Sequence, residues 1–154
     1  GRRVGYIVKL KPDENDLDLV IVGAEYGSGK RAGWLTSYIV ACKDENGKFL
    51  EVGKVASGLK EKAGEGTSYD EMTKLLTPLI TSEEGKIVRV KPKHVVAVTY
   101  QNIQRSPSYG SGWALRFPRI TAYRPDKRKT EIATLKEIAE DVKRVNKRES
   151  RGLG

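Results

Sequence analysis

The sequence Leu115-Arg116-Phe117-Pro118-Arg119-Ile120 is followed, four residues later, by Arg124-Pro125-Asp126-Lys127. The first segment lies in the strand-like run Trp113–Tyr123, in which arginines are interspersed with apolar residues. A strand of this kind buries one face in a core and exposes the other. Guanidinium groups stay charged and hold phosphate oxygens in an oriented, two-pronged way. We therefore predict a strand over residues 113–123 whose exposed face binds a polyphosphate.

Length and composition indicate one small globular domain, with room for an appendage. The chain has 154 residues, of which 38% are hydrophobic. It has no apolar run near the roughly 18 residues that a membrane helix needs and no signal-peptide pattern, so no membrane partner is expected. The single cysteine, Cys42, excludes an internal disulfide framework and suits a reducing, cytoplasmic compartment.

Positive charge exceeds negative charge and is clustered toward the C-terminal half. Lys and Arg number 29 against 20 Asp and Glu, which gives a formal net charge of +9. Residues 105–129 hold seven basic groups and one acid, and residues 143–151 hold five basic groups and one acid. Clustered charge of this kind indicates a polyanionic partner, of which nucleic acid is the commonest.

The start of the chain suggests an origin in a longer polypeptide. The sequence begins at Gly1, its only methionine is Met72, and a strand-like pattern begins almost at once, at Tyr6–Lys11. That run places Lys9 and Lys11 on the same face of a strand. The polar, turn-forming segment Pro12–Asp16 follows and is a candidate hinge.

The next segments predict a β-hairpin with a glycine-rich tip. Leu17–Ala24 and Trp34–Cys42 are both β-rich apolar runs. Between them, Tyr26–Gly33 contains Lys30 and Arg31 but lacks the Ser or Thr and the following helix of an ATP-hydrolysing phosphate loop. Two interpretations stay open: a flexible hairpin alone, or a tip whose backbone amides and two cations approach phosphates.

The remaining patterns complete a mainly β fold of about six strands, with one helix in mid-chain and one at the C-terminus. Ser68-x-x-Glu71 is a capping box, and an apolar stripe from Met72 to Leu79 predicts a helix that ends near Pro78. A small antiparallel OB-fold barrel with one inserted helix and a C-terminal helix fits this order. The other predicted segments are the strands Phe49–Ala56, Lys86–Lys91 and His94–Tyr100, the Asp44–Gly47 turn, and a helix from about Thr130 to Lys147 before a frayed end.

The sequence shows no self-sufficient active site. It has no Cys/His metal-ligand spacing and no paired carboxylates in a recognisable cleft, and the sole histidine, His94, has no partner cluster. No metal site is therefore predicted. What remains are cations that can stabilise charge in phosphoryl or nucleotidyl transfer without supplying the nucleophile.

Two segments carry a resemblance to a known family. Ala114–Ile120 with Arg124-x-Asp126-Lys127 resembles motif VI of the ATP-dependent DNA ligases, and Ile7–Lys11 resembles the motif V strand that closes their adenylation domain. The match runs in family order from about Gly5 to Lys127 and is most similar to the archaeal branch. Further segments similar to the family's C-terminal OB domain are Leu17–Ala24, Gly29–Gly33, Glu51–Val55 and Tyr100–Ser106.

The resemblance implies a domain order and a function. Residues 1–11 would end the adenylation domain, residues 12–16 would form the hinge, residues 17–129 the OB-fold domain, and residues 130–154 a C-terminal helix and basic tail. The whole enzyme would use ATP and Mg²⁺ to seal nicks in DNA replication, repair and recombination, inside the cell at the nucleoid. Its partners would be nicked duplex DNA and the adenylation domain of the same polypeptide, and a sliding clamp stays open as a further partner.

The resemblance also implies roles for single residues. Three positions match the catalytic group that orients the pyrophosphate of ATP during enzyme adenylylation, three match nucleotide-binding positions, and four would contact DNA. They are, in that order, Arg124, Asp126 and Lys127; Lys9, Lys11 and Arg119; and Lys30, Arg31, Arg116 and Phe117.

Departures from the family limit what this chain can do. The family's nucleophilic lysine lies in a KxDG motif, and no KxDG occurs here, so the chain alone is expected to be inert. Ile120 replaces the commoner phenylalanine at a position that we expect to face the core.

Other functions fit the sequence less well. A stand-alone nucleic-acid-binding OB module would stack bases on exposed aromatic residues, and few aromatics are placed that way. The OB domain of an RNA ligase or capping enzyme would lack the RFPR form with its downstream RxDK. A basic β-domain used only for protein contacts would not explain the phosphate-binding residues.

Overall fold

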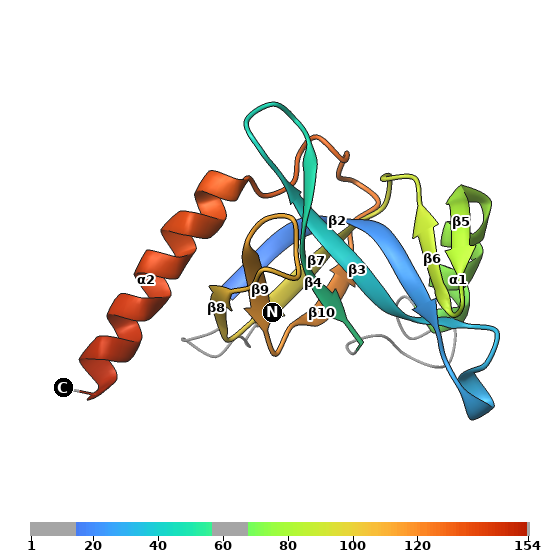
Figure 1. Ribbon diagram of the computed structural model, residues 1–154, viewed down its shortest axis with the longest axis horizontal. Coiled ribbons are helices and arrows are strands. Elements are labelled where there is room, and N and C mark those ends of the chain that lie inside the picture. Colours follow the sequence, from blue (N-terminus) through green and yellow to red (C-terminus); the bar gives the residue numbers. More distant parts are fainter. Residues whose placement is uncertain (1–14, 57–67, 154) are drawn as a thin grey trace, which may run out of the picture.

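The structure, a computed structural model, describes residues 15–56 and 68–153, and the predicted strand Tyr6–Lys11 with Lys9 and Lys11 lies outside them. No helix among the described residues is long and apolar enough to cross a membrane. The elements in chain order (Figure 1) are β2 Asn15–Tyr26, η1 Gly29–Arg31, β3 Leu35–Lys43, β4 Phe49–Val55, α1 Tyr69–Leu76, η2 Thr77–Leu79, β5 Ile80–Glu84, β6 Ile87–Val90, β7 Val95–Tyr100, β8 Asn102–Arg105, β9 Trp113–Arg116, β10 Arg119–Tyr123 and α2 Leu135–Leu153.

Strand β2 is the centre of the main sheet. Along one edge it pairs with β3, and along the other it pairs first with β7 and then with β6, all antiparallel. The change from β7 to β6 comes just before Gly23, where a Cβ atom would lie 3.0 Å from Ile39 Cδ1 and 3.1 Å from the Val88 carbonyl oxygen. A residue without a side chain therefore allows β3 and β6 to approach β2 closely at this point.

Alternation along β2 supplies two apolar layers. Leu17, Leu19 and Ile21 belong to the main core, whereas Val20 faces the opposite side of the sheet. There Val20 packs in a second, smaller cluster with Ala41, Val95 and Ile132. Ile132 comes from the segment between β10 and α2, so this segment covers the outer face of β2.

The structure confirms the turn and the helix cap that the sequence predicts in the first half of the fold. The Asp44–Gly47 turn joins β3 to β4, with Asp44 Oδ1 accepting from the Asn46 and Lys48 N–H groups at 2.8 and 2.9 Å. Ser68 caps α1, because its hydroxyl oxygen accepts from the Glu71 N–H at 3.1 Å. Cys42 is buried within β3.

The predicted single strand over residues 113–123 is wrong. The structure divides it into β9, which pairs with β8 in a two-stranded sheet, and β10, which pairs with β7 in the main sheet. Phe117 lies at the break with a φ of 53°, and Pro118 follows, which cannot donate a backbone hydrogen bond. A left-handed residue followed by proline ends β9 and redirects the chain into the other sheet.

The strand count and the last helix also differ from the prediction. The described residues form nine strands instead of about six. The prediction lacks β5 and β8, and the predicted strand Trp113–Tyr123 is divided into β9 and β10. The last helix begins at Leu135 instead of Thr130, since Thr134 and Glu137 form a capping box in which the Glu137 N–H donates to Thr134 Oγ1 at 3.1 Å. It continues to Leu153, where a frayed end was predicted.

The predicted fold class, mainly antiparallel β with one inserted helix and a C-terminal helix, is confirmed. Strand pairing does not close the main sheet within the described residues, because β10 and β4 end its main strand order and β5 ends the branch through β6. Helix α2 runs along the side of the sheet where β8 and β9 lie (Figure 1) and contacts β8. The Tyr100 hydroxyl fastens α2 to the sheet by donating to Asp141.

Replacing Ser68 with Ala should lower the free energy of unfolding by about 1 kcal/mol, because the Glu71 N–H loses its capping partner. Chemical denaturation followed by circular dichroism measures the difference. Ser82, an exposed serine in β5, is the matched control, and its replacement by Ala should change stability by less than about 0.5 kcal/mol. Equal effects of the two substitutions would contradict the capping role.

Candidate phosphate-binding site

The end of β10 fixes the position of the predicted catalytic residues. β10 is irregular at Thr121, whose hydroxyl donates to the Ala97 carbonyl oxygen of β7 at 3.3 Å. The Arg124 N–H then donates to the Val95 carbonyl oxygen at 2.8 Å, so the chain stays attached to β7 beyond the strand. The Lys127 N–H donates to the Arg124 carbonyl oxygen at 3.1 Å and closes a turn. This turn carries all three predicted catalytic residues.

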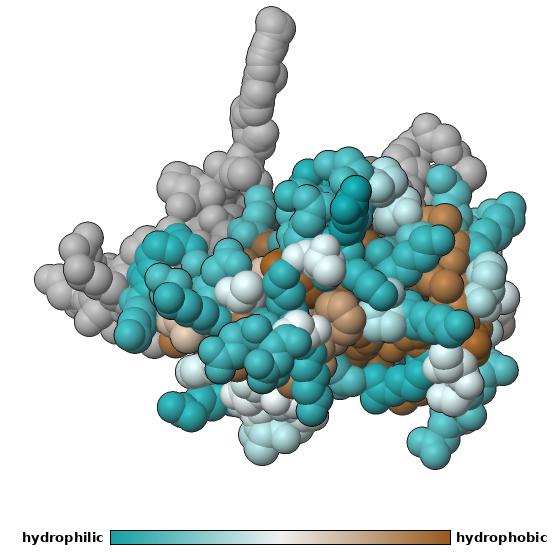
Figure 2. Space-filling model, turned by 90° about the horizontal axis from the view of Figure 1, so that it is seen from above, coloured by the Kyte–Doolittle hydropathy of each residue, from teal (hydrophilic) through white to brown (hydrophobic). Residues whose placement is uncertain are grey.

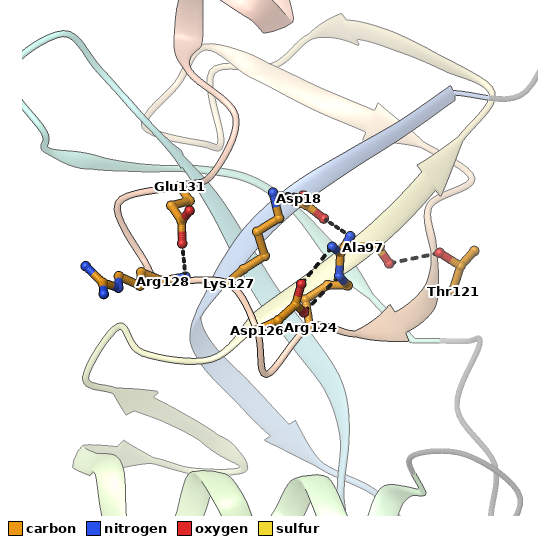
Figure 3. Close-up of polar contacts among 8 residues, drawn as sticks. All are labelled: Asp18, Ala97, Thr121, Arg124, Asp126, Lys127, Arg128 and Glu131. Carbon is orange, nitrogen blue, oxygen red and sulfur yellow. Dashed lines mark hydrogen bonds and ion pairs between the residues drawn. The ribbon is translucent and has the colours of Figure 1, made fainter.

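Four charged side chains meet at the turn and form what we call the Arg124 cluster: Arg124, Asp126, Lys127 and Asp18 (Figure 3). Arg124 donates to both oxygens of Asp126, from Nε at 3.2 Å and from Nη2 at 3.1 Å. Its Nη1 donates to Asp18 Oδ1 at 3.4 Å, and Lys127 Nζ lies 3.6 Å from Asp18 Oδ2. Because Asp18 belongs to β2, the cluster joins the turn to the central strand.

The charges of the Arg124 cluster stabilise one another. The hydrogen bond from Arg124 holds the pKa of the Asp126 carboxyl below its ordinary value, and a backbone hydrogen bond and the charge of Lys127 act in the same direction. In return, the hydrogen bond to Asp126 and the charge of Asp18 raise the pKa of Arg124. Two cations therefore face two carboxylates, and the cluster is electrically balanced at neutral pH.

The turn between β9 and β10 presents the predicted DNA-binding pair. Phe117 is 63% exposed, and the Arg116 guanidinium carbon lies 5.1 Å from the centre of its ring. Leu115 and Ile120, on either side of this turn, are buried in the core, as predicted for Ile120. Apolar residues thus anchor both strands while Arg116, Phe117 and the exposed Arg119 lie on the surface.

The glycine-rich tip between β2 and β3 is a folded turn. Residues Gly29–Arg31 form the short helix η1, and Lys30 is exposed. The Arg31 guanidinium carbon lies 5.2 Å from the ring centre of Tyr69, which stacks on Trp34 with ring centres 6.2 Å apart. The tip is therefore braced against the start of α1, at the end of the molecule opposite α2 (Figure 1).

A cleft of about 630 Å³ opens beside the Arg124 cluster, between the residues that precede β7 and the segment that follows β10. At its wall, His94 Nδ1 shares a hydrogen bond of 2.9 Å with the Tyr123 hydroxyl, and the two rings meet edge to face. Burial lowers the pKa of His94, and the charge of Lys93 acts in the same direction. The residues that line the cleft are Pro92, Lys93, His94, Val95, Tyr123, Arg124, Pro125, Lys127, Arg128, Lys129 and Thr130.

The structure brings together only part of the predicted site. Arg124, Asp126 and Lys127 share one turn, Arg116 and Phe117 lie at the opposite end of β10, and Lys30 and Arg31 lie at the separate η1 tip. Sequence reasoning missed Asp18, although it is the sole charged residue in the apolar run Leu17–Ala24 and is for that reason unusual. Within the described ranges, no three His, Cys, Asp or Glu side chains are placed to hold a metal ion.

Comparison with known proteins identifies relatives of this chain. Residues 31–127 match the family described as the ATP dependent DNA ligase C terminal region. The DNA ligase of Nanoarchaeum equitans is 57% identical over 141 residues, which cover 90% of this chain and 25% of that protein. The DNA ligase of Thermococcus fumicolans is 50% identical over 141 residues, which cover 91% of this chain and 24% of that protein. The chain thus spans about a quarter of the length of these curated relatives.

Solved structures of ligases share the fold. The ligase domain of LigD from M. tuberculosis gives a TM-score of 0.60 at 26% identity, covering 79% of this chain and 39% of that chain. A mycobacterial DNA ligase D complexed with ATP and MES gives a TM-score of 0.56 at 26% identity, covering 77% of this chain and 37% of that chain. The domain is therefore of the predicted OB-fold type.

Titration should reveal the pairing of Arg124 with Asp126. Because the pKa of Asp126 is lower in the folded chain than in the unfolded chain, the pair stabilises the fold above the unfolded pKa, and this contribution is lost as the pH falls through the folded value. Carboxyl-carbon NMR should place the Asp126 midpoint below 3.8, and replacing Arg124 with Gln should raise it. An unchanged midpoint in the variant would contradict the pairing.

Proposed function

The chain belongs to the family of ATP-dependent DNA ligases, as part of their C-terminal region, and on this premise we propose that it is the OB-fold domain of an enzyme that seals nicks in duplex DNA. It acts on phosphates in two steps of that reaction, at the nucleotide and at the nick. It supplies no KxDG lysine, so it works only with the adenylation domain of the same polypeptide.

The Arg124 cluster is the observation that supports a role in the ATP step. A guanidinium that already holds the two oxygens of Asp126 has the geometry to hold two phosphate oxygens. Asp18 and the bond from Arg124 N–H to Val95 keep the turn at a fixed place on the sheet. When the pyrophosphate of ATP approaches, Arg124 and Lys127 stabilise the charge that builds up on it as it leaves.

The turn between β9 and β10 serves the DNA step. Arg116 provides a charge for a backbone phosphate, and the exposed ring of Phe117 contacts the duplex beside it. Lys30, in the exposed η1 tip, adds a further backbone contact together with Arg31. The β9–β10 turn and the η1 tip reach the nicked duplex when the whole domain rotates about a hinge within residues 12–16. Of these hinge residues, Asn15 and Asp16 already belong to β2.

The cofactors and partners of the complete enzyme follow from the same proposal. ATP supplies the activated AMP, and Mg²⁺ accompanies its phosphates, while Lys9, Lys11 and Arg119 contribute further nucleotide contacts. Nicked duplex DNA and the adenylation domain are the partners, at the nucleoid. A sliding clamp is a further partner suggested by the family resemblance alone.

A stand-alone nucleic-acid-binding module is the alternative, and the type of DNA that is bound separates the two. Phe117 is the one large aromatic side chain that is strongly exposed in the described residues, whereas single-strand binding uses several stacking aromatics. The ligase domain should prefer nicked duplex to single strands, with an affinity that falls steeply with salt. Tight single-strand binding that tolerates salt would favour the alternative.

In the complete enzyme, replacing Arg124 with Ala should slow covalent AMP transfer to the protein by about a hundredfold, because the variant lacks a group that stabilises the leaving phosphates. Radiolabelled ATP measures this step, and sealing of a pre-adenylated nick should change much less. Lys48, exposed in the turn before β4, is the control site. Normal labelling of the Arg124 variant, or any labelling of the 154-residue chain alone, would refute the assignment.

Replacing Arg116 with Ala should weaken binding of nicked duplex and lower the slope of log affinity against log salt by about one unit, because the variant neutralises one phosphate fewer. Replacing Phe117 with Ala should weaken binding without changing that slope. Gel-shift titrations at several salt concentrations measure both, and covalent AMP transfer should stay normal in each variant. If either substitution slowed AMP transfer and spared DNA binding, the division of roles would be wrong.

A further inference from the structure

The positive charges that line the cleft beside the Arg124 cluster are not equally compensated. Arg124 and Lys127 face the carboxylates of Asp18 and Asp126. In contrast, no described carboxylate lies within 4.0 Å of the charged groups of the three other cations, which are Lys93, Arg128 and Lys129. Among the described residues, the uncompensated charge of the cleft therefore lies outside the segment of residues 124–127.

The guanidinium charge of Arg128 remains available to a ligand although an acidic residue lies nearby. Glu131 is close in sequence, but its Oε1 accepts from the Arg128 backbone N–H at 2.8 Å. The Glu131 N–H in turn donates to the Arg128 carbonyl oxygen at 2.9 Å. Figure 3 shows the Arg128 side chain extending away from both Glu131 and the Asp18 contacts. The neighbouring acid thus stabilises the turn and leaves the guanidinium group without a compensating carboxylate among the described residues.

Both walls of the cleft are held in place before any ligand arrives. Pro92 and Pro125 restrict the backbone on the two sides. The segment after β10 is pinned at one end by Arg124 and at the other by the Ala133 N–H, which donates to the Asp18 carbonyl oxygen at 2.9 Å. Ile132 is buried beneath it against the sheet. Because the backbone of both walls is already fixed, binding of an anion has to order only the side chains of the cations.

The lining of the cleft indicates what kind of anion fits. It contains no Asp, Glu, Asn or Gln side chain that could accept from or pair with the edge of a base. The Tyr123 hydroxyl and His94 Nδ1 are already bonded to each other. Figure 2 shows mostly hydrophilic residues, with hydrophobic ones between them, on the face seen from above Figure 1. The lining is therefore dominated by cations without carboxylates between them, which suits phosphate groups.

We propose that this cleft is a second phosphate-binding site, in which Lys93, Arg128 and Lys129 hold two or more phosphate groups. The phosphates belong either to a nucleic-acid backbone or to a free polyphosphate, since lysine and arginine bind both through the same oxygens. The site extends the proposed function, on which its use of duplex DNA rests, to residues that were given no role in either step.

The test compares two variants of equal net charge. In one, Lys93, Arg128 and Lys129 are replaced with Gln. In the other, the exposed residues Lys48, Lys74 and Lys136 are replaced with Gln. Binding of nicked duplex and of tripolyphosphate to the 154-residue chain is measured by calorimetry at several salt concentrations. Thermal unfolding confirms that each variant is folded, as expected for exposed substitutions.

The cleft variant should bind one or both probes more weakly than the control variant, with a salt slope for duplex lowered by about 0.9 for each phosphate that is no longer neutralised. Loss of duplex binding alone identifies a backbone site, and loss of tripolyphosphate binding alone identifies a free polyphosphate site. If the cleft variant matched the control with both probes, the inference would be overturned.

His94 provides an independent reporter, because it is the only histidine in the chain. Phosphate bound in the cleft should raise its pKa, since nearby negative charge favours the imidazolium form. Proton NMR should show this rise in the original chain and in the control variant, and not in the cleft variant. A His94 pKa that tripolyphosphate and duplex leave unchanged would count against the site.

The outcome is separable from that of the proposed function. Normal AMP transfer in the Arg124 variant, with weakened phosphate binding in the cleft variant, would remove the nucleotide role and keep the second site. The reverse pattern would keep the nucleotide role and remove the second site.

Discussion

The main sheet is organised by the pairing of β2 with three other strands. A strand of 12 residues is long enough for β7 and β6 to share one edge while β3 occupies the other. Because side chains alternate between faces, this one strand carries Leu17, Leu19 and Ile21 into the main core and Asp18 and Val20 onto the outer face. The outer face then receives the segment that follows β10. The turn that carries Arg124, Asp126 and Lys127 is thus built onto the strand that pairs with three others.

The electrical balance of the Arg124 cluster has a consequence for ligand binding. Asp18 and Asp126 orient Arg124 and Lys127 and also compete with any phosphate for them. Ionic hydrogen bonds of this kind are directional. The carboxylates therefore fix the geometry of the two cations and lower the affinity of these cations for phosphate. Lys93, Arg128 and Lys129 have no such competitors among the described residues. The two groups of cations therefore differ in their surroundings: carboxylates orient the first group, and no described carboxylate compensates the second.

The break at Phe117 separates two surfaces that are continuous in the sequence. A φ of 53° is unusual for an aromatic residue, and it persists because Leu115 and Ile120 are buried on either side. The strain places the Phe117 ring and Arg116 at one end of β10, while the Arg124 turn forms at the other. Short segments of one motif can in this way face different ligands.

Local structure and the grouping of charged residues along the chain could be predicted from the sequence alone. The capping box at Ser68, the Asn-Gly turn, the apolar runs of β2 and β3 and the arginines of residues 116–124 were readable because each depends on neighbours in the chain. Strand pairing and the packing of distant segments decide that Trp113–Tyr123 divides between two sheets, that Asp18 pairs with Arg124 across 106 positions, and that Lys93 lines the same cleft as Arg128. These relations depend on which strands pair and on which face each residue lies, and the energy that fixes them comes from burial and hydrogen bonding between segments far apart in the chain.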